Sequence, residues 1–120
     1  MGYPDVNVTN STPYPVTGGV TYESIFCSND TFNLNPGPGT TWSNGRGVCL
    51  ITSVYAVVTY NGQGVQAAPY SSSGTSYSQF AVVQTGDGAF AVTRLTGGAD
   101  DTVGEIQQVE IPEGTDPKTL

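Results

Sequence analysis

The sequence predicts an all-β fold: a single-domain antiparallel β-sandwich of about seven to eight strands, with a small β-barrel as the alternative. Three observations support this prediction. Apolar and polar residues alternate with a period of two along most of the chain, and turn residues recur about every ten positions. No segment shows the apolar stripe of an amphipathic helix. The 120 residues are expected to form one sandwich domain over residues 1–111, followed by a frayed acidic tail over residues 112–120.

The first part of the chain supplies three predicted strands. Val6 and Val8 alternate with polar neighbours, and a short strand around residues 32–34 continues this pattern. Between them, residues 16–26 place four apolar side chains on one face: Val16, Val20, Tyr22 and Phe26. Residues 35–39, Asn-Pro-Gly-Pro-Gly, are expected to form a loop, because proline lacks a backbone donor and glycine adopts unusual φ values.

The run from residue 48 to residue 60 is apolar in both alternating phases. Such a strand is expected at the centre of its sheet and covered on both faces. Later strands are predicted at residues 64–70, 75–85 and 89–95, with a weaker one at 102–111 and a surface loop at 71–76. Asn61-Gly62 and Gly86-Asp87-Gly88 are predicted to form hairpin turns between successive strands.

Cys27 and Cys49 allow one intramolecular disulfide, which would close a loop of about twenty residues and contribute about 3 kcal/mol. Two buried thiols are the alternative, since each cysteine lies beside strand-like apolar residues. No secretory signal and no apolar run long enough to span a bilayer are visible. An extracellular or surface location is expected if the disulfide forms, and a cytoplasmic one otherwise. Sequons at Asn7, Asn10 and Asn29 would carry glycan only after a eukaryotic secretory route.

The formal charge of −7 lies mainly at the C-terminal end of the chain. Residues 1–95 hold four acids and two arginines, a net charge of −2, whereas residues 96–120 hold six acids and one lysine, a net charge of −5. Nucleic acids and anionic lipid surfaces require clustered Lys and Arg, so neither is expected as a partner. The predicted surface is neutral and polar, because only 11% of the residues are charged.

Catalysis is not expected from this composition. The chain has no histidine, which is the commonest general base, and Glu23, Asp30 and Asp87 are scattered without a joining motif. No Gly-x-Ser-x-Gly or Ser-x-x-Lys motif is present, and no predicted helix follows the glycine clusters, which excludes phosphate loops. Neither cysteine belongs to a Cys-x-x-Cys motif, and no metal or other cofactor is predicted.

The segment of residues 40–46 is the best candidate for ligand binding. It holds the only tryptophan, Trp42, together with Asn44 and Arg46. Sugars are bound by an aromatic face under the ring and by directional hydrogen bonds from Asn, Asp or Arg side chains. The candidate ligand-binding residues are Trp42, Asn44, Arg46, Asp30, Tyr70 and Tyr77. The alternative is that Trp42 covers the end of the core and that the two tyrosines are partly buried.

Three functional classes remain open. The first is a non-catalytic, lectin-like binding module that recognises a carbohydrate, a cell-surface glycan or another neutral ligand, with oligomerisation raising its affinity. The second is a structural or self-assembling subunit of a capsid, fibre or matrix, because exposed strand edges pair readily. The third is a membrane-active β-sandwich toxin that uses Tyr and Trp at a neutral lipid interface.

Overall fold

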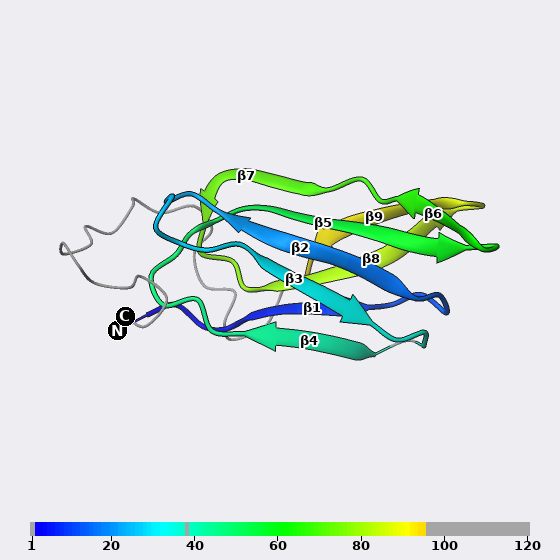
Figure 1. The fold of residues 1–120 in the computed structure, drawn as a ribbon, viewed down its shortest axis with the longest axis horizontal. Helices are drawn as coiled ribbons and strands as arrows, with labels where there is room; N and C mark the ends of the chain where they lie inside the picture. The colour runs from blue at the N-terminus through cyan, green and yellow to red at the C-terminus, as the bar shows by residue number, and fades with distance from the viewer. Residues whose placement is uncertain (1, 38, 96–120) are drawn as a thin grey trace.

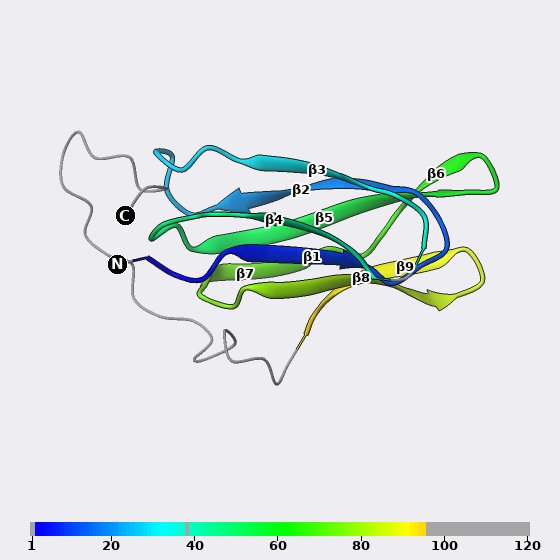
Figure 2. The same ribbon diagram turned by 90° about the horizontal axis from the view of Figure 1, so that it is seen from below.

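The computed structural model describes residues 2–37 and 39–95, which form nine β-strands and no helix. The strands lie in two sheets that pack together and do not close into a barrel (Figures 1 and 2). The predicted β-sandwich is therefore confirmed, and the barrel alternative is wrong for the described part of the chain.

The two sheets differ in size. The smaller sheet has the order β4-β1-β8-β9, and the larger has the order β3-β2-β5-β6, with β7 also paired to β5. The strands are β1 (Val6–Asn10), β2 (Val16–Tyr22), β3 (Asp30–Leu34), β4 (Thr40–Asn44), β5 (Ile51–Tyr60), β6 (Gln63–Gln66), β7 (Tyr70–Thr75), β8 (Gln79–Gly86) and β9 (Ala89–Arg94). The inward side chains of both sheets form one core that is rich in valine.

One strand pair departs from the predicted antiparallel arrangement. β1 runs parallel to β8, with Val8 opposite Phe80, whereas every other pair of named strands is antiparallel in the described residues. A parallel pair needs a long crossover connection, and here the chain passes through the whole larger sheet between β1 and β8. The alternation of apolar and polar residues within a strand indicates which side chains are buried. It does not indicate the direction of the neighbouring strand, so it does not reveal a parallel pairing.

Two strands, β4 and β7, form where the sequence predicted none. β7 replaces most of the loop predicted at residues 71–76, and the strand predicted from residue 75 begins at Gln79 instead. Ser72 stabilises this irregular strand, because its Oγ donates to the Ile51 carbonyl at 3.0 Å and accepts from the Gly74 N–H at 2.8 Å. Both β4 and β7 are polar edge strands, which lack the alternation that marks a half-buried strand.

Strand β5 is central, as predicted, but it is covered on only one face. Alternate residues from Val54 to Val58 point into the core, whereas Tyr55 and Val57 lie on the outer face with 36% and 37% of their surface exposed. An irregularity in the pairing between Ile51 and Ser53 shifts the phase, so Ile51 points inward as well. The alternate apolar positions that include Ile51, Tyr55 and Val57 are therefore divided between the core and the outer surface. The prediction that this strand is covered on both faces is wrong.

The predicted turns are confirmed. Asn61 and Gly62 join β5 to β6 with φ values of 50° and 76°, and the flanking Tyr60 and Gln63 are paired. This is the two-residue hairpin that Asn-Gly favours. Gly88, with φ of 68°, closes the β8–β9 hairpin, where Asp87 does not have a positive φ.

A buried asparagine joins the end of β1 to the loop that precedes β4. The Asn10 Nδ2 donates to the carbonyls of Tyr14 at 2.7 Å and Asn35 at 3.1 Å. Its Oδ1 accepts from the backbone N–H and the hydroxyl of Thr12 at 3.0 and 2.7 Å. The Asn10 side chain is fully buried, so the sequon that begins there is not presented to solvent.

The strand predicted at 102–111 and the tail predicted at 112–120 lie outside the described residues, as does the boundary between them. Within residues 2–37 and 39–95, no helix has the length and apolar character needed to cross a membrane.

Candidate functional site

The outermost strands β3 and β4, one from each sheet, contact each other along one side of the sandwich. Trp42 of β4 lies directly opposite the buried Val8 of β1, so its side chain is on the inner face of the smaller sheet. The half-buried indole packs against Phe32 of β3, with ring centroids 5.4 Å apart and planes inclined by 37°. Trp42 therefore covers the core at this open side while keeping part of its ring in contact with solvent.

Two polar residues adjoin this ring pair at the same side of the sandwich. Asn44 lies two residues after Trp42 on β4, and Asp30 lies two residues before Phe32 on β3. The Asn44 Nδ2 donates to the Asp30 Oδ1 at 3.1 Å. We call the group formed by Asp30, Phe32, Trp42 and Asn44 the seam site.

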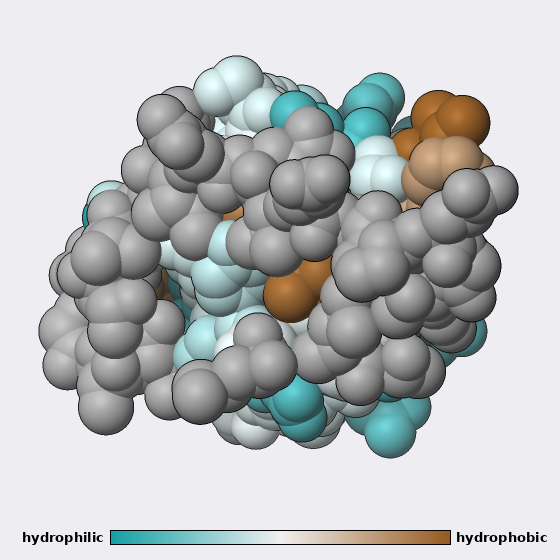
Figure 3. Space-filling model, turned by 90° about the vertical axis from the view of Figure 1, so that its left-hand side faces the viewer, coloured by the Kyte–Doolittle hydropathy of each residue, from teal (hydrophilic) through white to brown (hydrophobic). Residues whose placement is uncertain are grey.

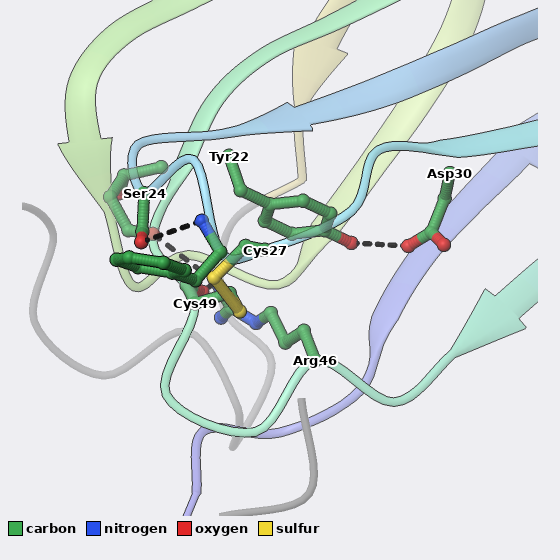
Figure 4. Close-up of a disulfide and its surroundings, with 8 residues drawn as sticks. Tyr22, Ser24, Cys27, Asp30, Arg46 and Cys49 are labelled. Atoms are coloured by element: carbon green, nitrogen blue, oxygen red, sulfur yellow. Dashed lines mark hydrogen bonds between the residues drawn. A yellow bond between two sulfur atoms is a disulfide. The ribbon is translucent and has the colours of Figure 1, made fainter. Parts of the chain in front are cut away.

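The Asp30 carboxylate is held from a second direction by Tyr22 of β2 (Figure 4). The Tyr22 hydroxyl donates to the Asp30 Oδ2 at 2.5 Å. Burial raises the pKa of Tyr22, and the hydrogen bond to Asp30 raises it further, so the phenol is a neutral donor throughout the physiological range. Asp30 is thereby fixed in position before any ligand arrives.

The seam site combines groups whose chemistry suits a neutral polar ligand. It offers the exposed part of an indole beside a carboxylate and an amide whose positions are fixed by hydrogen bonds. The Asn44 side chain is exposed, and within the described residues its bond to Asp30 leaves the amide oxygen and a second N–H toward solvent.

Arg46, predicted to contact ligand, is completely buried near the disulfide (Figure 4). All five of its N–H groups are used by protein oxygens, which belong to Pro4, Cys49, Thr75, Ser76 and Ser78. Burial lowers the pKa of this guanidinium to about 10, so it remains charged at neutral pH. Arg46 therefore has no donor left for a ligand, and its role in the described structure is to join separate segments of the chain.

The two candidate tyrosines lie away from the seam site. Tyr70 of β7 packs against Phe80, with ring centroids 4.9 Å apart. The ring of Tyr77 is covered by Arg94, whose guanidinium carbon lies 3.3 Å from the ring centroid. Both rings are partly buried against the core, so the structure brings together Trp42, Asn44 and Asp30 but not the whole predicted set.

The cysteine pair that the sequence left open is a disulfide. Cys27 and Cys49 are bonded, with Cα atoms 6.1 Å apart and a sequence separation of 22. The loop closed at Cys27 is shaped by its own hydrogen bonds, since Ser24 accepts from the N–H groups of Phe26 and Cys27 through its hydroxyl and its carbonyl, at 3.1 and 3.0 Å.

This loop presents two large apolar side chains that sequence reasoning placed in a strand. Ile25 is 92% exposed and Phe26 is 73% exposed, although residues 16–26 were predicted as a single strand. Hydrophobic surface is visible at the end of the molecule where this loop lies (Figure 3). An Ile-Phe pair directly before a disulfide-bonded cysteine is the signal that could have identified this exposed tip.

Within residues 2–37 and 39–95, no group of three or more His, Cys, Asp or Glu side chains could hold a metal ion. Comparison of the chain with protein-family models, with curated proteins and with solved structures gives no significant match.

Proposed function

We propose that this protein is a non-catalytic binding module that recognises a neutral carbohydrate at the seam site. The observation that carries the proposal is the Asp30–Asn44 hydrogen bond beside the partly exposed ring of Trp42. An apolar sugar face packs on an indole, while its hydroxyls require donors and acceptors in fixed directions. The hydrogen bond from Tyr22 to Asp30 supports the proposal, because a fixed acceptor reduces the entropy lost on binding.

The expected affinity of a single seam site is modest. The site is a shallow edge built from a few side chains, and only part of the indole is exposed. Multivalent display would raise the apparent affinity without any new contact. A binding experiment should therefore present the sugars at high surface density.

The test is a glycan array probed with the parent protein, Trp42→Ala and Asn44→Ala. The parent protein is expected to be retained on at least one neutral glycan, and each substitution is expected to weaken retention at least about tenfold. Asn44→Ala is the sharper variant, because Asn44 is exposed and its replacement leaves the ring packing of Trp42 intact.

Asn35→Ala is the matched control. Asn35 is also exposed, but its carbonyl rather than its side chain makes the hydrogen bonds found in the structure. The control should bind as the parent protein does. Retention of no neutral glycan by the parent protein, or equal retention by all four proteins, would remove the proposal.

A second candidate function is attachment to a neutral lipid surface through the tip formed by Ile25 and Phe26. Their exposure on a loop anchored by the adjacent Cys27–Cys49 disulfide favours this role. Apolar side chains at such a convex tip can insert at the level of the lipid headgroups. Co-sedimentation with phosphatidylcholine vesicles should then be lost in an Ile25→Ser, Phe26→Ser double variant and kept in Val57→Ser, which changes an exposed apolar residue elsewhere.

Self-assembly through strand edges remains an alternative prediction. β4 and β9 are the outermost strands of the smaller sheet in the described residues. The outer edge of β9 is bonded to Ala68 through Phe90 and Val92, so a second copy would pair with β4. Light scattering over a range of concentrations tests this alternative, because a strictly constant monomeric mass would contradict it.

A further inference from the structure

The outer face of the larger sheet is a second surface with the properties of a binding site. Residues that lie opposite one another on neighbouring strands form rows across this face, and the pairing register gives the members of each row. The outward positions in these rows are Asn33, Thr17, Val57 and Gln66 in the first row, Thr31, Gly19 and Tyr55 in the second, and Thr21, Ser53 and Ser71 in the third. Tyr55 therefore lies near the centre of a face built otherwise from small or polar residues.

Tyr55 lies down across the neighbouring strand instead of pointing away from the sheet. A Cβ atom placed on Gly19 would be 2.4 Å from the Tyr55 hydroxyl oxygen and 2.6 Å from its Cζ. The phenol ring thus occupies the space above β2 that any side chain at position 19 would need. The tip of the Tyr55 ring therefore lies over β2 at Gly19, and 36% of the residue's surface is exposed.

The preceding residue, Gly18, lies against an aromatic ring on the opposite side of β2. A Cβ atom on Gly18 would clash with the backbone carbonyl of Tyr55 on β5, and it would be 2.8 Å from the Phe32 Cζ inside the core. Gly18 and Gly19 therefore let Phe32 pack on the inner side of β2 and Tyr55 on its outer side. The Tyr55 ring is held against a strand whose inner side is itself tightly packed.

Hydrogen-bonding groups surround the Tyr55 ring, and no charged residue occupies the three rows. Thr21 shares hydrogen bonds with the hydroxyls of Ser53 at 2.6 Å and Thr52 at 2.8 Å, which orders the hydroxyls beside the ring. Among the described residues, no protein group bonds to the Tyr55 hydroxyl, so it can bond to a ligand. The face thus combines one exposed ring with ordered hydroxyls and carries no charge.

We propose that this face binds a neutral polysaccharide chain, with one sugar ring on Tyr55 and its neighbours along the rows of Thr, Ser and Asn side chains. The inference extends the proposed carbohydrate-binding function to a second surface, and it rests on different residues from the seam site. A flat face suits an extended chain or a polymer surface, whereas the seam site suits a short sugar at an edge.

The chemistry of the face argues against other occupants. A lipid surface needs contiguous apolar area, and the rows hold only one aliphatic residue, Val57. Nucleic acid and anionic glycans need cations, which the rows lack. A second copy of this chain could cover a flat neutral face, and the experiment includes that outcome.

The experiment measures binding to neutral polymers by the parent protein and by Tyr55→Ala. The probes are insoluble cellulose and chitin in pull-down, and soluble glucan and mannan in affinity electrophoresis, with heparin as the anionic control. The parent protein should bind at least one neutral polymer and not heparin, and Tyr55→Ala should weaken that binding at least about tenfold. Leu95→Ala is the matched control, because Leu95 has a similar exposed fraction of 38% but lies outside the three rows, so its replacement should leave binding unchanged.

Asn44→Ala separates this inference from the proposed function. Polymer binding that Tyr55→Ala weakens and Asn44→Ala does not supports the face, even if no short glycan is retained on the array. Equal polymer binding by the parent protein and Tyr55→Ala, or no polymer binding at all, overturns the inference. It is also overturned if sedimentation shows a dimer of the parent protein that Tyr55→Ala converts to a monomer, since a second copy then covers the face.

Discussion

Two polar clusters, one around Arg46 and the other around Asp30, use their hydrogen-bonding groups in opposite ways; Figure 4 shows these two residues near the disulfide end of the sandwich. The Arg46 cluster is closed, because every N–H of the guanidinium bonds to a protein oxygen and the side chain is fully buried. The seam site is open, because Asn44 is exposed and bonds to Asp30 through a single N–H. Satisfied and buried groups stabilise a fold, whereas fixed and exposed groups can bind a ligand.

The largest effect is expected for Arg46→Met. The substitution leaves the carbonyls of Pro4, Cys49, Thr75 and Ser76 buried without their donor, so the free energy of unfolding should fall by about 3 kcal/mol or more. Denaturant unfolding checks this value. The free energy of unfolding of Arg46→Lys should lie between those of the parent protein and Arg46→Met, because an ammonium group has fewer N–H groups than a guanidinium and a different geometry. A loss below about 1 kcal/mol for Arg46→Met would mean that the closed cluster contributes little to stability.

The next effect concerns the disulfide that joins this end of the molecule. Replacing Cys27 and Cys49 together by serine should lower the free energy of unfolding by about 3 kcal/mol, because the bond closes a loop with a sequence separation of 22. Parent protein unfolded in the presence of a reductant should lose the same amount. If the double variant and the oxidised parent protein have the same thermal midpoint, the loop contributes no such constraint.

A smaller effect, with a defined pH dependence, is expected for Tyr22→Phe. At neutral pH the variant loses the hydrogen bond to Asp30, which should cost about 1 kcal/mol. The pKa of Tyr22 is raised above its ordinary value of 10.0, so the contribution of Tyr22 is fully present below pH 10 and is lost as the pH rises further. The stability difference between parent and variant should therefore shrink above pH 10, which unfolding midpoints at a series of pH values measure. A difference that grows with pH would contradict the assigned hydrogen bond.

The smallest effect on stability is expected for Asn44→Ala. Asn44 is exposed at the end of β4, so the free energy of unfolding should change by less than about 0.5 kcal/mol. Thermal unfolding of the parent protein and the variant checks this expectation. A large loss would place Asn44 with Arg46 among the structural groups and would erase the contrast between the clusters.

The sequence predicts the parts of this fold that depend on local pattern. Alternation identifies β1, and Asn61-Gly62 identifies the hairpin between β5 and β6, because both signals lie in a few adjacent residues. The polar edge strands β4 and β7 were missed, since their pairing partners, rather than their own composition, make them strands. The parallel pairing of β1 with β8 was missed for the same reason.

The candidate site was predicted only in part, because its geometry is not local. Trp42, Asn44 and Asp30 meet because two strands that belong to different sheets contact each other along one side. Arg46 follows a glycine in a segment that resembles an exposed loop, but carbonyls from two other segments, at Pro4 and at Thr75 and Ser76, converge on it. Tyr55 was assigned to a buried strand face, and the Gly18-Gly19 pair opposite it was the available signal.

The most direct test of the account follows the side-chain resonances of the labelled protein during titration with a neutral oligosaccharide that the glycan array retains. Trp42 is the only tryptophan, so its indole N–H gives a single unambiguous signal. If the seam site binds the sugar, the resonances of the Trp42 indole and the Asn44 amide will shift with the sugar concentration, while that of the Arg46 Nε–H will not move. Saturable binding that leaves both Trp42 and Asn44 unshifted would contradict binding at the seam site.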